Sequence, residues 1–244
     1  MRAMSVFGIV LLGSMTAGQA SGAMLLTSTN EAQLEIWLGQ GDLDFTNIFT
    51  KTTGDGQDSV DFHAAADGMG PTFVLIEVRD YLMFPDYRST IVGGYNPLSW
   101  QISGNYIGNW NFTPNDADRT AFIFNLTTPE LRRQRLSTDD PYGYGQSQTY
   151  NSLYYGPMFG DYDIYVDSVL EHGYLYGRSY GTSNISLVGG FYDYRDYGRI
   201  EVYTFAAVDT APSSVPEPSS CLMAGLAGLG LVVRRRSRRA RFAA

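Results

Sequence analysis

The spacing of apolar and polar positions predicts two short helices near the start of the chain. In residues 29–39 three large apolar side chains recur at intervals of three and four, which places them on one face of a helix. Ser28 and Glu31 have the spacing of a capping box, and Gly39 is suited to ending the helix. A second short helix is predicted over residues 58–68, between an aspartate–serine pair and a glycine.

Most of the other apolar runs predict strands, because they are short, rich in β-branched and aromatic residues, and bounded by Gly, Pro, Asn or Asp. Strands do not alternate with helices, which argues against a doubly wound parallel sheet and for one mainly β (α+β) domain. The polar segment 129–148 carries three arginines and is expected to be an exposed loop. The predicted strands cover residues 72–80, 120–126, 162–168, 185–190 and 199–208.

The first 23 residues have the order of a secretory signal peptide. One arginine comes first, an apolar stretch follows over residues 6–12, and small residues continue to Ala23. Cleavage is expected after Ala23, with Ala20 as the alternative position. A buried N-terminal helix is the other interpretation of this pattern.

The chain ends in a segment of three parts, after a small, polar linker at 209–214. The motif Val215-Pro216-Glu217-Pro218 precedes an apolar run at 221–233, and a cluster of arginines that begins with Arg234, Arg235 and Arg236 follows the run. As a helix the run would measure about 20 Å at ~1.5 Å per residue, whereas a bilayer core is ~30 Å thick. It therefore suits a temporary stop during export, with the arginines on the cytoplasmic side.

This tail, residues 215–244, resembles the PEP-CTERM sorting signal of Gram-negative bacteria. Its two prolines cannot continue a helix, so they keep the backbone extended and accessible to a protease. The resemblance implies handling by an exosortase, a membrane enzyme regarded as cleaving near the motif, in hosts that typically make exopolysaccharide. The expected route is export through the signal peptide, transient anchoring in the inner membrane by the short transmembrane helix, and then the cell surface or extracellular matrix.

Charge and tyrosine content narrow the expected partners. Residues 24–214 carry ten basic and 24 acidic side chains, a formal charge of −14 against −8 for the whole chain. Such a surface repels nucleic acid and anionic lipid, which argues against nucleic acid and suits cations or neutral glycans. Fourteen of the 18 tyrosines fall within residues 142–203, either as amphipathic β-sheet faces or as a sugar-stacking surface. The single cysteine, Cys221, lies in the tail, so the domain has no disulfide, cysteine-based zinc site or catalytic thiol.

Several short stretches resemble, in the right order, the TLDc domain of the eukaryotic oxidation-resistance proteins. Their Gly-Pro and Gly-Gly pairs are turn formers, so the motifs are expected to preserve a fold rather than mark a reaction. The resemblance implies a TLDc-like antiparallel β-sandwich over 24–208, flanked by a few short helices and regarded as a protein-interaction module without established catalysis. The matching stretches are Asp55-Gly56 with Ser59, DGMGPTFVLIEV (67–78), Gly93-Gly94-Tyr95 with Trp100, GPMFGDYDIYV (156–166) and IEVY (200–203).

Two patterns resemble sites of catalysis or metal binding. GRSYG (177–181) matches the G-x-S-x-G nucleophile elbow, but that elbow needs a strand-to-helix turn and a histidine after the serine. Both histidines, His63 and His172, precede Ser179. The two histidines could share a metal, although packing or surface roles are more common for isolated histidines.

Asp161, Asp163 and Asp167 lie within seven residues beside glycine-rich turns, and they are candidate calcium ligands. Their spacing is not that of an EF-hand loop, and strand-end roles are the alternative. Calcium is the one candidate cofactor. The pair Asp139-Asp140 is expected to be solvated.

The function expected from the sequence is that of a secreted, non-catalytic binding module, sorted by an exosortase and partnered by exopolysaccharide or another envelope protein. The first alternative is a glycan-active or other hydrolase whose acids come from separated loops. The second is a structural matrix component that associates with itself.

Overall fold

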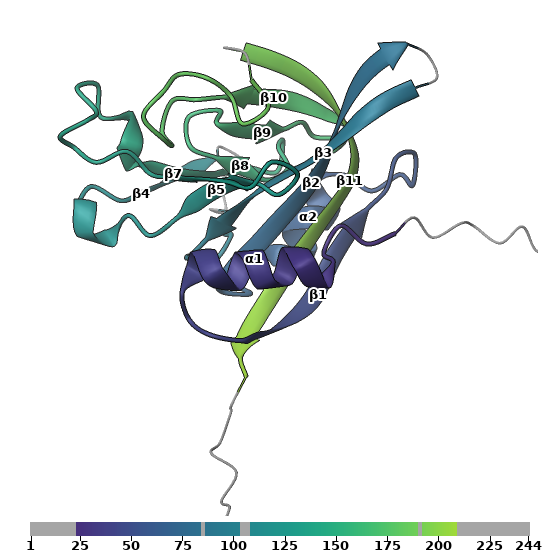
Figure 1. Ribbon diagram of the computed structural model, residues 1–244, viewed down its shortest axis with the longest axis horizontal. Helices are drawn as coiled ribbons and strands as arrows, with labels where there is room; N and C mark the ends of the chain where they lie inside the picture. The colour runs from purple at the N-terminus through teal and green to yellow at the C-terminus, as the bar shows by residue number, and fades with distance from the viewer. Residues whose placement is uncertain (1–22, 84–85, 103–107, 190–191, 209–244) are drawn as a thin grey trace, which may run out of the picture. The chain divides into compact units, whose positions relative to one another are not determined.

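The computed structural model describes residues 23–83, 86–102, 108–189 and 192–208 (Figure 1). Contacts divide the chain after Ala206, and the fold below belongs to the unit that ends there. Within the described ranges the helices are α1 (Ser28–Leu38), α2 (Ser59–Ala66), η1 (Asp116–Asp118) and η2 (Tyr144–Gln146). The strands are β1 (Leu43–Lys51), β2 (Thr72–Met83), β3 (Asp86–Asn96), β4 (Asn109–Phe112), β5 (Phe122–Asn125), β6 (Glu130–Arg133), β7 (Ser147–Asn151), β8 (Met158–Phe159), β9 (Ile164–Val166), β10 (His172–Tyr176) and β11 (Tyr192–Ala207).

The strands lie side by side in the order β4–β7–β8–β9–β10–β11–β2–β3–β5–β6, and β1 pairs with β11. Neighbours along this path are antiparallel. The first part of β11 pairs with β10, and a bulge between Tyr197 and Ile200 precedes its main pairing with β2. Because a bulge bends its strand, β11 can belong to two layers, β4 and β7–β10 in one and β2, β3, β5 and β6 in the other. The predicted antiparallel β-sandwich is confirmed.

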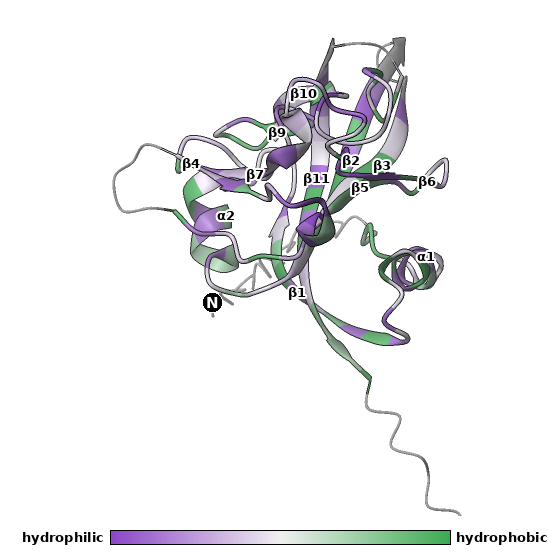
Figure 2. Cartoon of the chain, turned by 90° about the vertical axis from the view of Figure 1, so that its left-hand side faces the viewer, coloured by the Kyte–Doolittle hydropathy of each residue, from purple (hydrophilic) through white to green (hydrophobic). Residues whose placement is uncertain are grey.

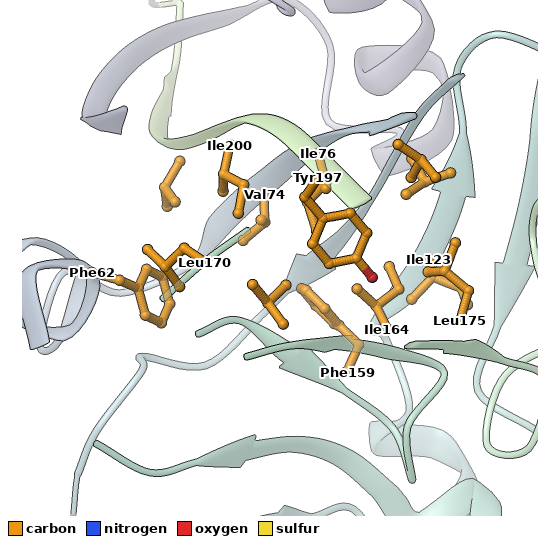
Figure 3. Close-up of a cluster of buried hydrophobic side chains, with 14 of the residues drawn as sticks. Phe62, Val74, Ile76, Ile123, Phe159, Ile164, Leu170, Leu175, Tyr197 and Ile200 are labelled. Carbon is orange, nitrogen blue, oxygen red and sulfur yellow. The ribbon is translucent and has the colours of Figure 1, made fainter. Parts of the chain in front are cut away.

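The first hydrophobic core lies between the two layers. Val74 and Ile76 of β2 meet Phe159 of β8 and Ile164 of β9, and all four side chains are fully buried. Figure 3 shows side chains of the two layers pointing toward one another. The α2 helix adds Phe62 to this core, so it is packed by tertiary contacts rather than held by helix propensity alone.

The second core lies on the other face of the β2 layer, beneath α1. Phe73 and Leu75 alternate with the residues that face the first core, so β2 is buried on both faces and reads as a continuous apolar run. Leu34 of α1 is fully buried here, and Trp37 packs 5.8 Å from the ring of Phe124. Figure 2 shows α1 and α2 on opposite sides of the strands.

Both predicted helices are confirmed, with one correction to their caps. The capping box predicted for Ser28 and Glu31 is wrong, because the N-cap is Thr27, whose hydroxyl accepts the N–H of Asn30 at 3.3 Å. Gly39 ends α1 in the left-handed conformation, as predicted. The second helix does have a capping box, formed by its aspartates at positions 58 and 61.

Four of the five predicted strands are confirmed as β2, β5, β9 and β11, whereas the strand predicted at 185–190 is wrong. A turn forms there, in which Gly189 donates its N–H to the carbonyl of Ser186 at 3.1 Å. The exposed loop predicted at 129–148 is right only for part of the segment: residues 136–139 are exposed, whereas β6 and η2 lie within the segment and Gln134 and Asp140 are buried. Asp140 is therefore not solvated: its carboxylate accepts the N–H of Gly145 at 2.5 Å.

The predicted signal peptide, linker and sorting tail lie outside the described residues, apart from Ala23. In the part of the chain that the structure describes, no helix is long and apolar enough to cross a membrane.

The Gly93-Gly94 pair shows how the sequence motifs preserve the fold. A Cβ on Gly94 would lie 2.6 Å from ring atoms of Phe159 in the facing layer, and one on Gly93 would lie 1.9 Å from the carbonyl oxygen of Val74. Both distances are too short for any larger residue, so the two layers and the β2–β3 pair can approach only at glycine.

We expect Gly94→Ala to lower the free energy of unfolding by about 1–3 kcal/mol, the usual cost of overpacking a core. Urea unfolding measures this loss. In the double variant Gly94→Ala/Phe159→Leu, the smaller side chain makes room for the methyl group, so the combined loss should be less than the sum of the single losses. Additive losses would show that the contact with Phe159 is not the cause.

Candidate functional site

One outer face of the sandwich carries a row of aromatic side chains. Trp110 of β4 lies opposite Tyr150 of β7, and Tyr174 of β10 has Tyr165 of β9 and Tyr194 of β11 as its partners on either side. Since residues that lie opposite one another in an antiparallel sheet point to the same face, these rings form one surface. We call this surface the aromatic face and define it as Phe112, Trp110, Tyr150, Tyr155, Tyr162, Tyr165, Tyr174, Tyr194 and His172.

The rings of the aromatic face touch one another without a gap from β4 to β11. Every successive pair has its ring centroids within the range of favourable aromatic contacts, 4.5–7 Å. The centroid separations are 4.7 Å for Trp110–Tyr150, 6.0 Å for Tyr150–Tyr155, 5.1 Å for Tyr155–Tyr165, 5.8 Å for Tyr165–Tyr174 and 5.3 Å for Tyr174–Tyr194. The row crosses six strand positions, which at ~4.8 Å per strand spacing makes it about 24 Å long.

The aromatic face remains open to solvent in the described structure. Phe112 and Tyr194, at its two ends, keep 57% and 56% of their surface exposed, and Tyr162 keeps 39%. The apolar contacts of α1 and α2 belong to the two cores, so neither of these helices covers the row. On soluble proteins, a contiguous exposed apolar surface of this kind usually marks a binding site.

Three tyrosines of this face, Tyr162, Tyr165 and Tyr194, have pKa values raised above the ordinary value of tyrosine. Burial, with a smaller contribution from neighbouring tyrosines and Asp167, raises the pKa of Tyr165 to about 12. The pKa of Tyr194 is also raised, by burial first and then by the negative charges of Asp167 and Asp196. At these positions the face presents neutral hydroxyl groups, able to donate and accept hydrogen bonds, with carboxylates along its border.

A second group of rings continues the surface beyond β10. The guanidinium carbon of Arg178 lies 4.8 Å from the ring centroid of Tyr144 and 5.0 Å from that of Tyr176, both within cation–π range. Its Nη1 pairs with the carboxylate of Asp161 at 2.5 Å, which leaves the group close to neutral overall. Tyr142, 80% exposed, extends it outward at 5.8 Å from Tyr144.

The candidate calcium ligand Asp163 is fully buried and serves the chain itself. Its carboxylate accepts the backbone N–H groups of Arg178, Ser179 and Tyr180 at 2.8–3.0 Å. A Cβ on Gly160 would lie 2.2 Å from one of its oxygens, so the glycine makes room for the carboxylate. This explains why glycine and aspartate occur together in the GPMFGDYDIYV stretch.

The other two candidates have separate partners. Asp161 pairs with Arg178, and Asp167 accepts the N–H groups of Glu171 at 3.1 Å and His172 at 3.3 Å. Within the described ranges, no group of three or more His, Cys, Asp or Glu side chains could hold a metal ion, which includes these three aspartates.

The remaining sequence candidates, Ser179 and the two histidines, contact other groups of the chain. Ser179 is fully buried, its hydroxyl accepts the N–H of Asp161 at 2.8 Å, and no helix begins within residues 180–189, so GRSYG is not a nucleophile elbow. His63 is buried on α2, with its ring nitrogens 2.8 Å from the carboxylate of Asp67 and 3.0 Å from the carbonyl of Ser152. His172 lies elsewhere, stacked on Tyr194 at 5.7 Å, so the two histidines have different partners.

Sequence reasoning identified the tyrosine-rich region but missed the strands β4 and β7 that begin the row. Trp110 and Phe112 stand two residues apart, as do Tyr174 and Tyr176, and this spacing places each pair on one face of a strand. That period-2 aromatic pattern was the signal available in the sequence.

These features define an antiparallel β-sandwich domain with an open aromatic face. The family model of the TLDc domain matches residues 23–206, and the chain belongs to the TLDc family. The PEP-CTERM protein-sorting motif matches residues 214–239, which implies processing by an exosortase. Comparison with curated proteins gives no match.

Proposed function

We propose that this TLDc domain is a non-catalytic polysaccharide-binding module of the cell surface or extracellular matrix, and that the aromatic face is its binding surface. The observation that carries the proposal is the unbroken row of partly exposed rings from β4 to β11. The C–H-rich faces of sugar rings stack on aromatic rings as other apolar surfaces do, and tyrosine hydroxyls bind their hydroxyl groups.

The length and charge of the face support a long and mostly neutral ligand. A row of about 24 Å spans several consecutive sugar units, whereas a single sugar would need only one or two rings. The carboxylates of Asp161, Asp167 and Asp196 border the row and can accept hydrogen bonds from sugar hydroxyls. The formal charge of −14 over residues 24–214 opposes a nucleic acid, which also stacks on aromatic rings.

The sorting motif supports the same class of ligand. A PEP-CTERM tail resembles the signals of hosts that make exopolysaccharide, so the polymer would be present where the protein is delivered. To bind such a polymer in the matrix, the domain needs no catalytic group; it needs only a binding surface that is exposed in the folded state.

Co-sedimentation of the purified full-length chain with the host's extracellular polymer tests the proposal. We expect saturable binding that is the same in calcium and in chelator, because the described aspartates are engaged by the chain itself. Absence of binding in both buffers contradicts the proposal. Release of soluble sugar from the polymer would favour the hydrolase instead, and assembly of the chain without polymer would favour a structural component.

The sorting motif predicts cleavage near its Pro-Glu-Pro triplet during transfer to the surface. One epitope tag placed after Ala244 and a second tag in the exposed stretch at Ser137 and Thr138 distinguish the products. In immunoblots of surface fractions we expect the internal tag alone, on a band shortened by about 30 residues. Both tags on the same surface band would show that the tail is retained.

A further inference from the structure

A pocket of about 390 Å³ lies beside β6, at the end of the strand path opposite to β4. Its walls are β6, the residues that follow it and the turn at 181–183, and Arg132, Arg133 and Arg135 are among its lining residues. Three of the ten basic residues in 24–214 therefore line one pocket of a strongly acidic domain, together with the two carboxylates of Glu130 and Asp139. The positive charge of the domain is therefore concentrated at this pocket.

The three guanidinium groups are unequally neutralised. Arg132 pairs through Nε with the carboxylate of Glu130 at 2.6 Å. Arg133 is exposed, donates to the carbonyl oxygen of Trp37 at 3.2 Å, and lies 5.5 Å from the ring centroid of Phe122. The positive charge of Arg133 therefore has no carboxylate partner among the described residues.

Arg135 is also held by neutral groups only. Its Nη2 donates to the carbonyl oxygens of Gly177 at 3.2 Å and Ser183 at 2.9 Å, and to the side-chain oxygen of Asn184 at 2.9 Å. Its Nε is buried and has no hydrogen-bond partner among the described atoms. These contacts fix the guanidinium in the pocket wall without an ion pair to Glu130 or Asp139, the two carboxylates of the lining, so it keeps the charge that can bind an anion.

We infer that this pocket binds the carboxylate of an acidic sugar unit, a uronate, within the polysaccharide that the aromatic face holds. The inference rests on the proposed function and adds to it the charge of the ligand. Planar guanidinium groups match a carboxylate better than any other common cation does, because two N–H groups can meet its two oxygens. The polymer would then carry occasional acidic units among neutral ones.

The lining and position of the pocket favour a sugar over an acidic peptide. Thr182 and Ser183 supply hydroxyl groups for a polyhydroxylated ring, while the apolar lining is limited to Leu131 and Leu136. The pocket also adjoins the ring surface: Arg135 binds Gly177, which stands between Tyr176 and Arg178 in the chain. One extended polymer could therefore reach both regions.

Isothermal titration of the full-length chain with trigalacturonate and with its methyl ester tests this inference. The two probes share their sugar rings, and only the first carries charged carboxylates. We expect trigalacturonate to bind at least tenfold more tightly at low salt, since hydrogen bonds between charged groups are stronger than those between neutral groups, and to lose affinity as salt rises. Arg133→Gln should remove about tenfold of this affinity, whereas the matched variant Arg88→Gln, which removes an exposed charge on β3, should leave it unchanged.

The outcomes separate the pocket from the aromatic face. Equal affinity for the acid and the ester, or no effect of Arg133→Gln, overturns the inference. Tighter binding of poly-glutamate with the same dependence on Arg133 would also overturn it, by assigning the pocket to an acidic peptide. If a neutral polymer fails to bind while trigalacturonate binds in the predicted way, the pocket remains and the proposed role of the aromatic face fails.

Discussion

Replacing Tyr165 and Tyr194 together by alanine is expected to weaken binding of the host polysaccharide by about 30-fold to 150-fold. Tyr165 stands in the middle of the row, in contact with Tyr155, Tyr162 and Tyr174, and Tyr194 is its most exposed tyrosine. Stacking contributes about 1–1.5 kcal/mol per ring, and two rings therefore account for about 2–3 kcal/mol. Affinity electrophoresis in gels that contain the polymer measures the change.

Two further variants separate stacking from a loss of fold. The double variant Tyr165→Phe/Tyr194→Phe keeps both rings and should keep most of the affinity. Ile36→Ala removes an apolar side chain, 73% exposed, from α1 on the other side of the domain, and it should change nothing. If the phenylalanine and alanine variants lose affinity equally while both unfold normally, the hydroxyl groups rather than the stacked rings bind the ligand.

The elements that the sequence predicts well are those whose burial is uniform along the element. β2 is apolar on both faces because it lies between two cores, so its run of five apolar residues, interrupted by one glutamate, was unambiguous. α2 was equally clear, since its capping residues and its terminal glycine agree with its buried face. Local pattern and tertiary packing point in the same direction at these places.

The segment 129–148, which supplies most of the lining of the pocket beside β6, was predicted only in part, because several polar residues in and around it form hydrogen bonds with distant partners. Arg119 is buried and donates to the backbone carbonyl oxygens of Thr113, Pro114 and Arg135, and Gln134 binds the hydroxyl of Thr113. From the sequence such polar residues are expected to be exposed to solvent. Their neighbours in the sequence do not indicate that a carbonyl oxygen of another segment will accept their hydrogen bonds.

The aromatic face was half predictable for a related reason. The abundance of tyrosine was visible, but a ring in a strand can point either into a core or toward solvent. Tyr180 and Tyr197 are fully buried in the first core, whereas Tyr165 and Tyr194 belong to the open surface. Only the pairing of β9 with β10 and of β10 with β11 decides which tyrosines share a face.

The stability of the domain is expected to fall as the pH rises from about 4 to 7, because of Asp163. Complete burial raises the pKa of this carboxyl group from 3.8 to about 7, and the N–H groups of Ser179, Tyr180 and Arg178 offset part of that increase. In the unfolded chain the carboxyl group returns to its ordinary pKa, so between these two values the folded state binds more protons. The stabilisation is complete below about pH 4 and is lost as the pH rises through 7, by as much as about 4 kcal/mol.

The difference between the wild type and Asp163→Asn isolates this group, because the amide has nearly the shape of the protonated acid and does not titrate. The pKa values of Asp116 and Glu171 are lowered by their hydrogen bonds, which gives the opposite trend with pH, but these residues are the same in both proteins and cancel in the difference. Tyr180, whose pKa is raised well above 10 by burial, does not titrate in this window. Urea unfolding from pH 4 to 8 should therefore show the wild type losing stability relative to Asp163→Asn. A difference that is flat, or that grows in favour of the wild type, would mean that the backbone N–H groups of 178–180 keep Asp163 charged in the folded domain.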